Sequence, residues 1–213
     1  AFSLDNLDAC KGSLTINGTV SVTGKLTVVN ALVINGTLTI NNGGSFVQNS
    51  TTTANLGDGV FNVNMTLSGS TNAAGTAANG RYWFIGSPMN NTVAGTFYDV
   101  QGLARLWQYN GSNNSWPSVV STTLSSNNAL KLVPGIGYLF RAGVSKSFTF
   151  TGGTSEFNNN ITTSLLPASA ATGYLPVNGY SNSTGFKFVS NPYPSHVDWH
   201  LVTRTGLNVS YWI

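Results

Sequence analysis

The sequence predicts an all-β protein: a short β-solenoid stem, then a β-sandwich or jelly-roll-like module and the start of a second copy of that module. Three observations predict this fold. Charged residues make up only 7 % of the 213 residues, and the chain is instead rich in Asn, Ser, Thr and Gly, which favour turns and strand faces. A six-residue repeat fills residues 14–43. Aromatic residues in short runs bounded by Gly, Pro and Asn dominate from residue 81 onward.

The repeat has aliphatic residues at its first and third positions and Gly or Asn at its fifth. Its five copies, over residues 14–43, read LTINGT, VSVTGK, LTVVNA, LVINGT and LTINNG. Alternation places both aliphatic residues on one face of a short strand, and Gly and Asn tolerate a tight bend. Such strands are typical of a β-solenoid, although Asn-Gly also forms hairpin turns, so a meander of hairpins is the alternative. Five hexads fill only two or three coils, so something else must cap the stack.

We expect four segments along the chain. They are the solenoid with the residues that lead into it (1–67), a small polar loop or linker (68–80), the sandwich-like module (81–185) and an incomplete second copy (186–213). Further strands are expected outside the hexads, at 45–48, 60–66, 82–85, 105–109, 138–142, 146–151 and 186–189.

The second copy is predicted from an internal similarity. The stretch WFIGSPM, which contains Pro88, is echoed by KFVSNPY, which contains Pro192, 104 residues later. A tryptophan follows each proline after a similar interval, at Trp107 and Trp212. This matched spacing favours a repeat over chance similarity of short strands.

Charge and cysteine content exclude several classes of protein. The nine Lys and Arg residues are scattered, and the net charge of +3 reflects a scarcity of acids. Because a nucleic-acid-binding face needs clustered basic residues, we expect no nucleic-acid partner. A single cysteine, Cys10, excludes an intrachain disulfide. No apolar run approaches the roughly 20 residues of a membrane span, and any signal peptide is expected to have been removed already.

Catalytic and metal sites are poorly supported, and we expect no cofactor and no enzyme activity. Six acids spread along the chain offer little for paired-carboxylate chemistry. On a strand, His196, Asp198 and His200 would share a face and could ligate zinc. The stronger interpretation is that Asp198 caps the turn after Pro194 and that the Trp199 side chain has a packing role. Pro192 and Pro194 disfavour a regular strand just before the segment 196–200.

Aromatic residues around a polar loop suggest a carbohydrate platform, because Trp and Tyr faces stack on the apolar faces of sugars. Trp107, Tyr109 and Trp116 surround the loop, and Trp116 is expected to be exposed. The alternative is that Trp107 and Tyr109 are inward core residues of one strand. The candidate ligand-binding residues are Trp116, Asn110, Asn113 and Asn114.

Several segments in order resemble a family. The segments GTLTINNGGSFVQN, RYWFIGSPMN, LWQYNGSNNSW, PGIGYLFRAG, FTFTGG and GFKFVSNPYPSHVDW are similar to those of very large exported proteins of Bacteroidota that look like type IX secretion cargo. The resemblance covers about residues 13–213, with Ser190 in place of the usual Gly. Its motif residues are Pro88, Asn191, Pro192, Pro194, Asp198 and Trp199.

The resemblance implies export by the type IX machinery and display outside the cell. The C-terminal sorting domain usual in the family is absent from this sequence, so the chain is expected to be part of a longer protein. We therefore expect a non-catalytic, extracellular structural or adhesive module whose contacts come from polar loops at 110–115 and 158–163. The alternatives are a carbohydrate-binding accessory module of an exported enzyme, or a self-associating filament subunit completed by strand donation.

Overall fold

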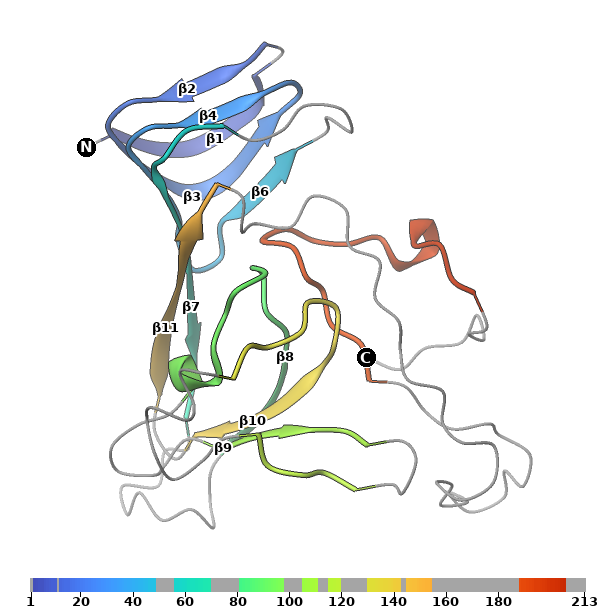
Figure 1. The fold of residues 1–213 in the computed structure, drawn as a ribbon. Helices are drawn as coiled ribbons and strands as arrows, with labels where there is room; N and C mark the ends of the chain where they lie inside the picture. Colours follow the sequence, from blue (N-terminus) through green and yellow to red (C-terminus); the bar gives the residue numbers. More distant parts are fainter. Residues whose placement is uncertain are drawn as a thin grey trace.

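The structure is a computed structural model that describes residues 2–10, 12–48, 56–69, 81–97, 105–110, 115–119, 130–142, 145–154 and 188–205. Within these residues the chain is all-β, as the sequence predicts, and its strands form three sheets (Figure 1). The strands are β1 (Phe2–Cys10), β2 (Leu14–Ile16), β3 (Thr19–Val28), β4 (Leu32–Ile34), β5 (Thr37–Ile40), β6 (Ser45–Gln48), β7 (Val60–Leu67), β8 (Arg81–Ile85), β9 (Arg105–Gln108), β10 (Tyr138–Ala142) and β11 (Lys146–Gly153). Two 3₁₀ helices, η2 (Ala94–Phe97) and η3 (Trp199–Leu201), complete the described elements. The described part contains no helix with the length and apolar character needed to cross a membrane.

The hexad repeat forms a β-solenoid of parallel strands. Leu14 of β2 lies opposite Leu32 of β4, and Val20 of β3 lies opposite Leu38 of β5. Equivalent residues are therefore 18 positions apart, which is three hexads, so each hexad supplies one side of a coil. The second half of β3 pairs with β6 to form the third side, and β1 adds a further parallel strand next to β3. Because all these pairs are parallel, the hairpin alternative is excluded.

The inward face of the solenoid consists of the aliphatic positions of the repeat. Its buried members are Ile16, Val22, Leu26, Val28, Leu32, Ile34, Leu38 and Ile40. At the bends, Asn35 Nδ2 donates to Asn17 Oδ1 of the previous coil at 2.8 Å. A Cβ on Gly36 would lie 2.0 Å from the carbonyl oxygen of Gly18, so successive coils stack this closely only because the bend residue is glycine.

Strand β7 belongs to both halves of the molecule. Its first four residues, Val60–Val63, pair in parallel with β5 and so continue the solenoid. All of β7 also pairs in the antiparallel sense with β11, from the Val60–Gly153 pair to the Leu67–Lys146 pair. The β7–β11 ladder runs from the solenoid to the second half in Figure 1. Strand β11 thereby covers the outer edge of β7, and provides part of the cap that the short repeat requires.

The second half is a β-sandwich. One layer is the β7–β11 ladder, and the other is the three-stranded antiparallel sheet in the order β8–β10–β9. The layers meet at a cluster of buried phenylalanine rings. The Phe140 ring of β10 lies 5.2 Å from the Phe148 ring of β11, and the Phe97 ring of η2 lies 4.9 Å from that of Phe148. All three side chains are almost fully buried, so they form the core of this half.

Residues 188–205 lie against both halves, as the red segment of Figure 1 shows. Val189 forms an antiparallel bridge with Ile136, just before β10. Further along, the backbone N–H of Phe46 in β6 donates to the carbonyl oxygen of Pro194 at 2.8 Å. The interpretation of 186–213 as a second copy stays a prediction. The predicted linker from residue 70 onward and the predicted loop 158–163 lie outside the described residues.

A candidate ligand-binding face on the outer sheet

The outer face of the β8–β10–β9 sheet presents aromatic rings instead of polar side chains. Alternation along β8 directs Ile85 inward and places Tyr82 and Phe84 outward. These two outward rings are 54 % and 69 % exposed, respectively. Both values are high for large aromatic side chains on a regular strand, and so this face is a candidate binding surface.

Arg141 of β10 lies between two rings on this face. Its Cζ is 5.3 Å from the Tyr82 ring centroid and 5.9 Å from the Trp107 ring centroid. One guanidinium nitrogen, Nη1, donates to the Tyr82 hydroxyl at 2.9 Å. The centroids of Tyr82 and Trp107 are 6.3 Å apart although the two residues come from opposite edges of the sheet, so both rings lean over the central strand.

A second group of rings lies beside the first, at the start of β10. The Phe188 ring is 4.9 Å from Phe84 and 5.5 Å from Trp116, and the Trp116 ring is 5.1 Å from Tyr109. Phe188 reaches this position because Gly137 has no side chain: a Cβ there would lie 2.6 Å from the Phe188 ring. We call the whole set the aromatic face, and it comprises Tyr82, Phe84, Trp107, Tyr109, Trp116, Leu139, Arg141 and Phe188.

Main-chain hydrogen bonds hold Phe188 in this place. The N–H of Gly137 donates to the Phe188 carbonyl, and the N–H of Ser190 donates to the Gly135 carbonyl, both at 3.0 Å. The Ser190 hydroxyl also donates to the Ile136 carbonyl at 2.8 Å. Gly135 has a φ of 81°, which glycine adopts without strain. The Pro-Gly-x-Gly-Tyr segment therefore supplies both the turn and the space that residues 188–190 require.

The structure brings some of the predicted ligand-binding residues together. Trp116 belongs to the aromatic face and is 38 % exposed. Asn110 closes the base of the neighbouring hairpin, where its N–H donates to the Ser115 carbonyl at 2.9 Å. Asn113 and Asn114 lie outside the described residues. The interpretation of Trp107 and Tyr109 as inward core residues is wrong, because Leu106 is the buried residue here and its neighbour Trp107 points to the outer face.

Five members of the face were not predicted from the sequence: Tyr82, Phe84, Leu139, Arg141 and Phe188. A signal for the first two was present, because β8 has aromatic residues at consecutive positions, Tyr82 to Phe84, and alternation cannot bury them all. Phe188 could not be found in this way, because it joins the face through a contact with a segment about fifty residues earlier in the chain.

The Gly-Ser-Pro and Asn-Pro-Tyr-Pro motifs have structural roles in the described residues. Pro88, Pro192 and Pro194 are buried. Beside Pro88, the Ser87 hydroxyl donates to the Met89 carbonyl at 2.6 Å. Asn191 Oδ1 accepts from the N–H of Tyr193 at 2.9 Å, which turns the chain toward β6.

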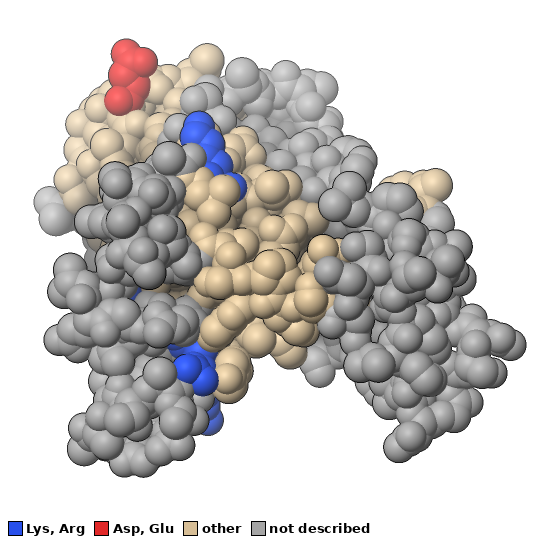
Figure 2. Space-filling view, turned by 60° about the horizontal axis from the view of Figure 1, so that its bottom comes forward, with Lys and Arg blue, Asp and Glu red and all other residues tan. Residues whose placement is uncertain are grey.

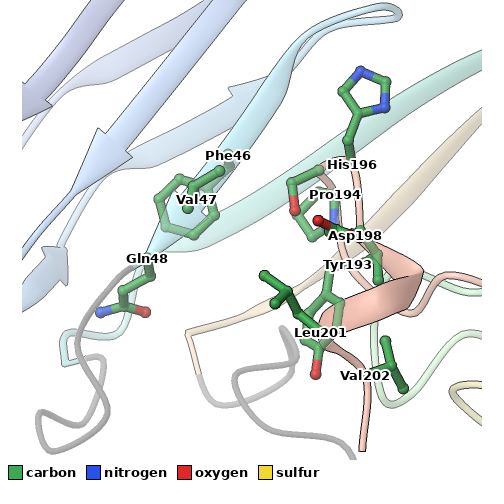
Figure 3. A pocket seen from close by; sticks show the side chains of 11 residues that line it. Phe46, Val47, Gln48, Tyr193, Pro194, His196, Asp198, Leu201 and Val202 are labelled. Carbon is green, nitrogen blue, oxygen red and sulfur yellow. The ribbon is translucent and has the colours of Figure 1, made fainter.

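Two cavities border this motif segment. One, of about 300 Å³, lies between β6 and residues 193–202, and Figure 3 shows the side chains that line it. The other, of about 440 Å³, lies between the 41–44 turn, β7 and residues 188–194, and none of the described residues that line it is charged. The larger cavity marks the junction of the solenoid, the sandwich and the motif segment.

His196, Asp198 and His200 do not form a three-ligand group. Asp198 instead caps η3, because its Oδ1 accepts from the N–H of His200 at 2.9 Å. The His200 ring lies 3.3 Å from the same carboxylate, whereas His196 points away from Asp198 in Figure 3. Within the described residues, no three His, Cys, Asp or Glu side chains lie close enough to hold a metal ion.

The described surface carries few charges. In Figure 2 the described part of the visible face is mostly tan, with Lys and Arg side chains near its top and bottom and acidic side chains only at its top edge. Among its described side chains, the aromatic face presents flat apolar rings and the guanidinium of Arg141. These groups bind ligands by stacking and hydrogen bonding.

Comparisons with known proteins identify a family. The comparisons found no match among curated proteins or among solved structures. The family described as a domain of unknown function, DUF8693, matches residues 4–210, which include the solenoid, the sandwich and the motif segment. The chain therefore belongs to the DUF8693 family.

Proposed function

We propose that the chain is a non-catalytic, extracellular structural and adhesive module of a large exported cell-surface protein. The solenoid serves as its stem, and the aromatic face serves as its contact surface. The observation that carries this proposal is the exposure of Tyr82, Phe84 and Trp116 on one face of a regular sheet.

Exposed rings of this kind favour binding over a purely structural role. An outward aromatic ring in water gives up the stabilisation that burial would bring, and contiguous apolar patches are typical of interaction sites. Within each of the two groups of this face the neighbouring rings are close, with centroid separations from 4.9 Å to 6.3 Å. A partner that covers them gains the burial that the isolated chain lacks.

The stem role is supported by the way the two halves join. Strand β7 is shared by the solenoid and the sandwich, so the face is held at a fixed place relative to the stem. Export by the type IX machinery rests on the resemblance of the LTING-type repeats and the NPYPS-x-x-DW motif to Bacteroidota surface proteins.

A carbohydrate-binding module is the second candidate, and the same rings favour it because sugars present apolar C–H faces. The filament alternative is a third candidate. Strand donation needs an edge strand, and β1 and β11 are the outermost strands in the order of the six-stranded sheet.

The test has two parts. Antibody labelling of intact producing cells checks display outside the cell. Beads coated with the chain are then counted on a panel of immobilised plant, animal and bacterial polysaccharides. We expect the wild-type chain to adhere and the Tyr82→Ala/Trp116→Ala variant to lose adhesion with an unchanged melting temperature.

The matched control is Leu201→Ala, which removes a side chain that is 83 % exposed but lies away from the aromatic face. It should adhere like the wild-type chain. Equal adhesion of the wild-type chain and the double variant would overturn the adhesive role of this face, and absence of labelling on intact cells would overturn its display.

A further inference from the structure

We propose that the aromatic face binds an acidic polysaccharide, in which a uronate carboxylate pairs with Arg141 while neighbouring sugar rings stack on the aromatic side chains. This inference rests on the proposed function, because it names the class of ligand that the same face takes.

Arg141 has donors to spare for such a ligand. A guanidinium group carries five N–H donors, and one of these is used on the Tyr82 hydroxyl. Among the described residues, the other contacts of this side chain are with the π faces of Tyr82 and Trp107. These rings hold the planar group in place, and the remaining donors match the two oxygens of a carboxylate, a geometry that lysine cannot provide.

The charge around Arg141 favours an anion. Among the side chains that the structure describes, only Asp58 and Asp198 are acidic, and neither is paired with Arg141. The β9–β10 register also places Arg105 directly opposite Arg141, so two arginine positions are neighbours in this sheet. A carboxylate at Arg141 thus meets a guanidinium that no acidic side chain among the described residues pairs with.

The two groups of rings favour an extended sugar polymer over a small anion or an acidic peptide. Tyr82 and Trp107 flank Arg141, and Phe84, Phe188 and Trp116 continue the surface on the same face. A polysaccharide presents a flat C–H face at successive sugars, so a single chain can stack on both groups. A uronate polymer adds carboxylates at regular intervals along such a chain. An aspartate- or glutamate-rich peptide also carries carboxylates, but it lacks the flat apolar faces.

The test compares each acidic polymer with its own carboxyl methyl ester, because esterification removes the charge and leaves the sugars unchanged. The probes are polygalacturonate, alginate and hyaluronan, and binding of the 213-residue chain is measured by titration calorimetry and affinity gel electrophoresis. We expect at least one acid form to bind about tenfold more tightly than its ester, and added NaCl to weaken the binding of the acid form.

Substitutions at Arg141 distinguish the contribution of its positive charge from that of its planar guanidinium group. Arg141→Gln should weaken binding of the acid form about tenfold and leave binding of the ester unchanged, and Arg141→Lys should fall between. The matched control is Arg204→Gln, because Arg204 also lies over a ring, 5.6 Å from the Trp199 centroid, but away from the aromatic face. This control should bind like the wild-type chain.

Three results would overturn the inference: no binding to any of the three acids, equal binding of every acid and its ester, or no effect of Arg141→Gln. The proposed function fails separately, when Tyr82→Ala/Trp116→Ala leaves adhesion intact. If the aromatic substitutions abolish adhesion but esterification and Arg141→Gln change nothing, the face is adhesive and its ligand is not acidic. Melting temperatures of all variants exclude loss of folding as the cause.

Discussion

Two glycines determine how residues 188–190 cross the end of the outer sheet. A Cβ on Gly137 would lie 2.6 Å from the Phe188 ring, and a Cβ on Gly86 would lie 2.1 Å from the Ser190 hydroxyl oxygen. Real Cβ atoms do not approach other atoms so closely, so each glycine provides space rather than backbone freedom. Neither residue has a left-handed φ, in contrast to Gly135.

Gly137→Ala should therefore displace Phe188 and destabilise the fold by about 1–3 kcal/mol, the usual cost of overpacking. Denaturant unfolding measures this change. Gly18→Ala is the matched control, because a Cβ at Gly18 meets nothing within 4 Å, and its effect should be under about 0.5 kcal/mol. In a double-mutant cycle with Phe188→Ala, the two costs should fail to add. Additive costs would show that the glycine does not act through Phe188.

Ionisation of Tyr138 is expected to lower the free energy of unfolding at alkaline pH. Burial raises the pKa of its phenol above the usual 10.0, against a smaller lowering by the hydrogen bond from the Val133 N–H. The neutral phenol is the form that the fold favours, so its contribution is fully present below pH 10 and is lost as pH rises through the folded pKa.

Tyr138→Phe removes the acceptor of the Val133 N–H and should cost about 1 kcal/mol at neutral pH. The free-energy gap between the wild-type chain and the variant should then shrink above pH 10. Unfolding curves at pH 8 and pH 11 give both values. A gap that stays constant over this range would show that the Tyr138 phenol has the same pKa in the folded and the unfolded chain.

At the scale of elements, the outer sheet has two faces with opposite roles, and one phenylalanine on each makes the contrast measurable. Phe140 points inward and is fully buried, whereas Phe84 points outward and is 69 % exposed. Phe140→Ala should cost about 3–5 kcal/mol. Phe84→Ala should change stability far less and reduce adhesion instead. Similar stability losses from both substitutions would show that the outer ring is part of the core.

Several strands could be predicted from the sequence because their signals are local, whereas β1 was not predicted and β3 continues through the bend expected near Gly24. The aliphatic pattern of the hexads indicated β2, β4 and β5, and the run at 146–151 lies within β11. The pairing of residues 188–190 with 135–137 could not be predicted, since nothing local specifies a partner so far away. The same reason explains the candidate site: Trp116 was identifiable alone, but its neighbour Phe188 is brought there by the fold.

At the scale of the whole molecule, the solenoid and the sandwich share β7, and we expect them to unfold together. A scanning calorimeter should record one transition, with equal calorimetric and van't Hoff enthalpies, because loss of β7 removes a strand from the solenoid and breaks the β7–β11 layer of the sandwich. Two resolved transitions would show that the halves are independent domains. The family match, which spans both, agrees with a single unit.

The shared strand also has a mechanical consequence. Force applied to the aromatic face reaches the stem along β7 and therefore loads the β7–β11 ladder in shear. In this geometry the eight residue pairs of the ladder bear the force together instead of opening one after another. Because β7 runs without interruption from the solenoid into the sandwich, we expect the two halves to move as one rigid body. A ligand held under flow would then meet the rings at a constant angle.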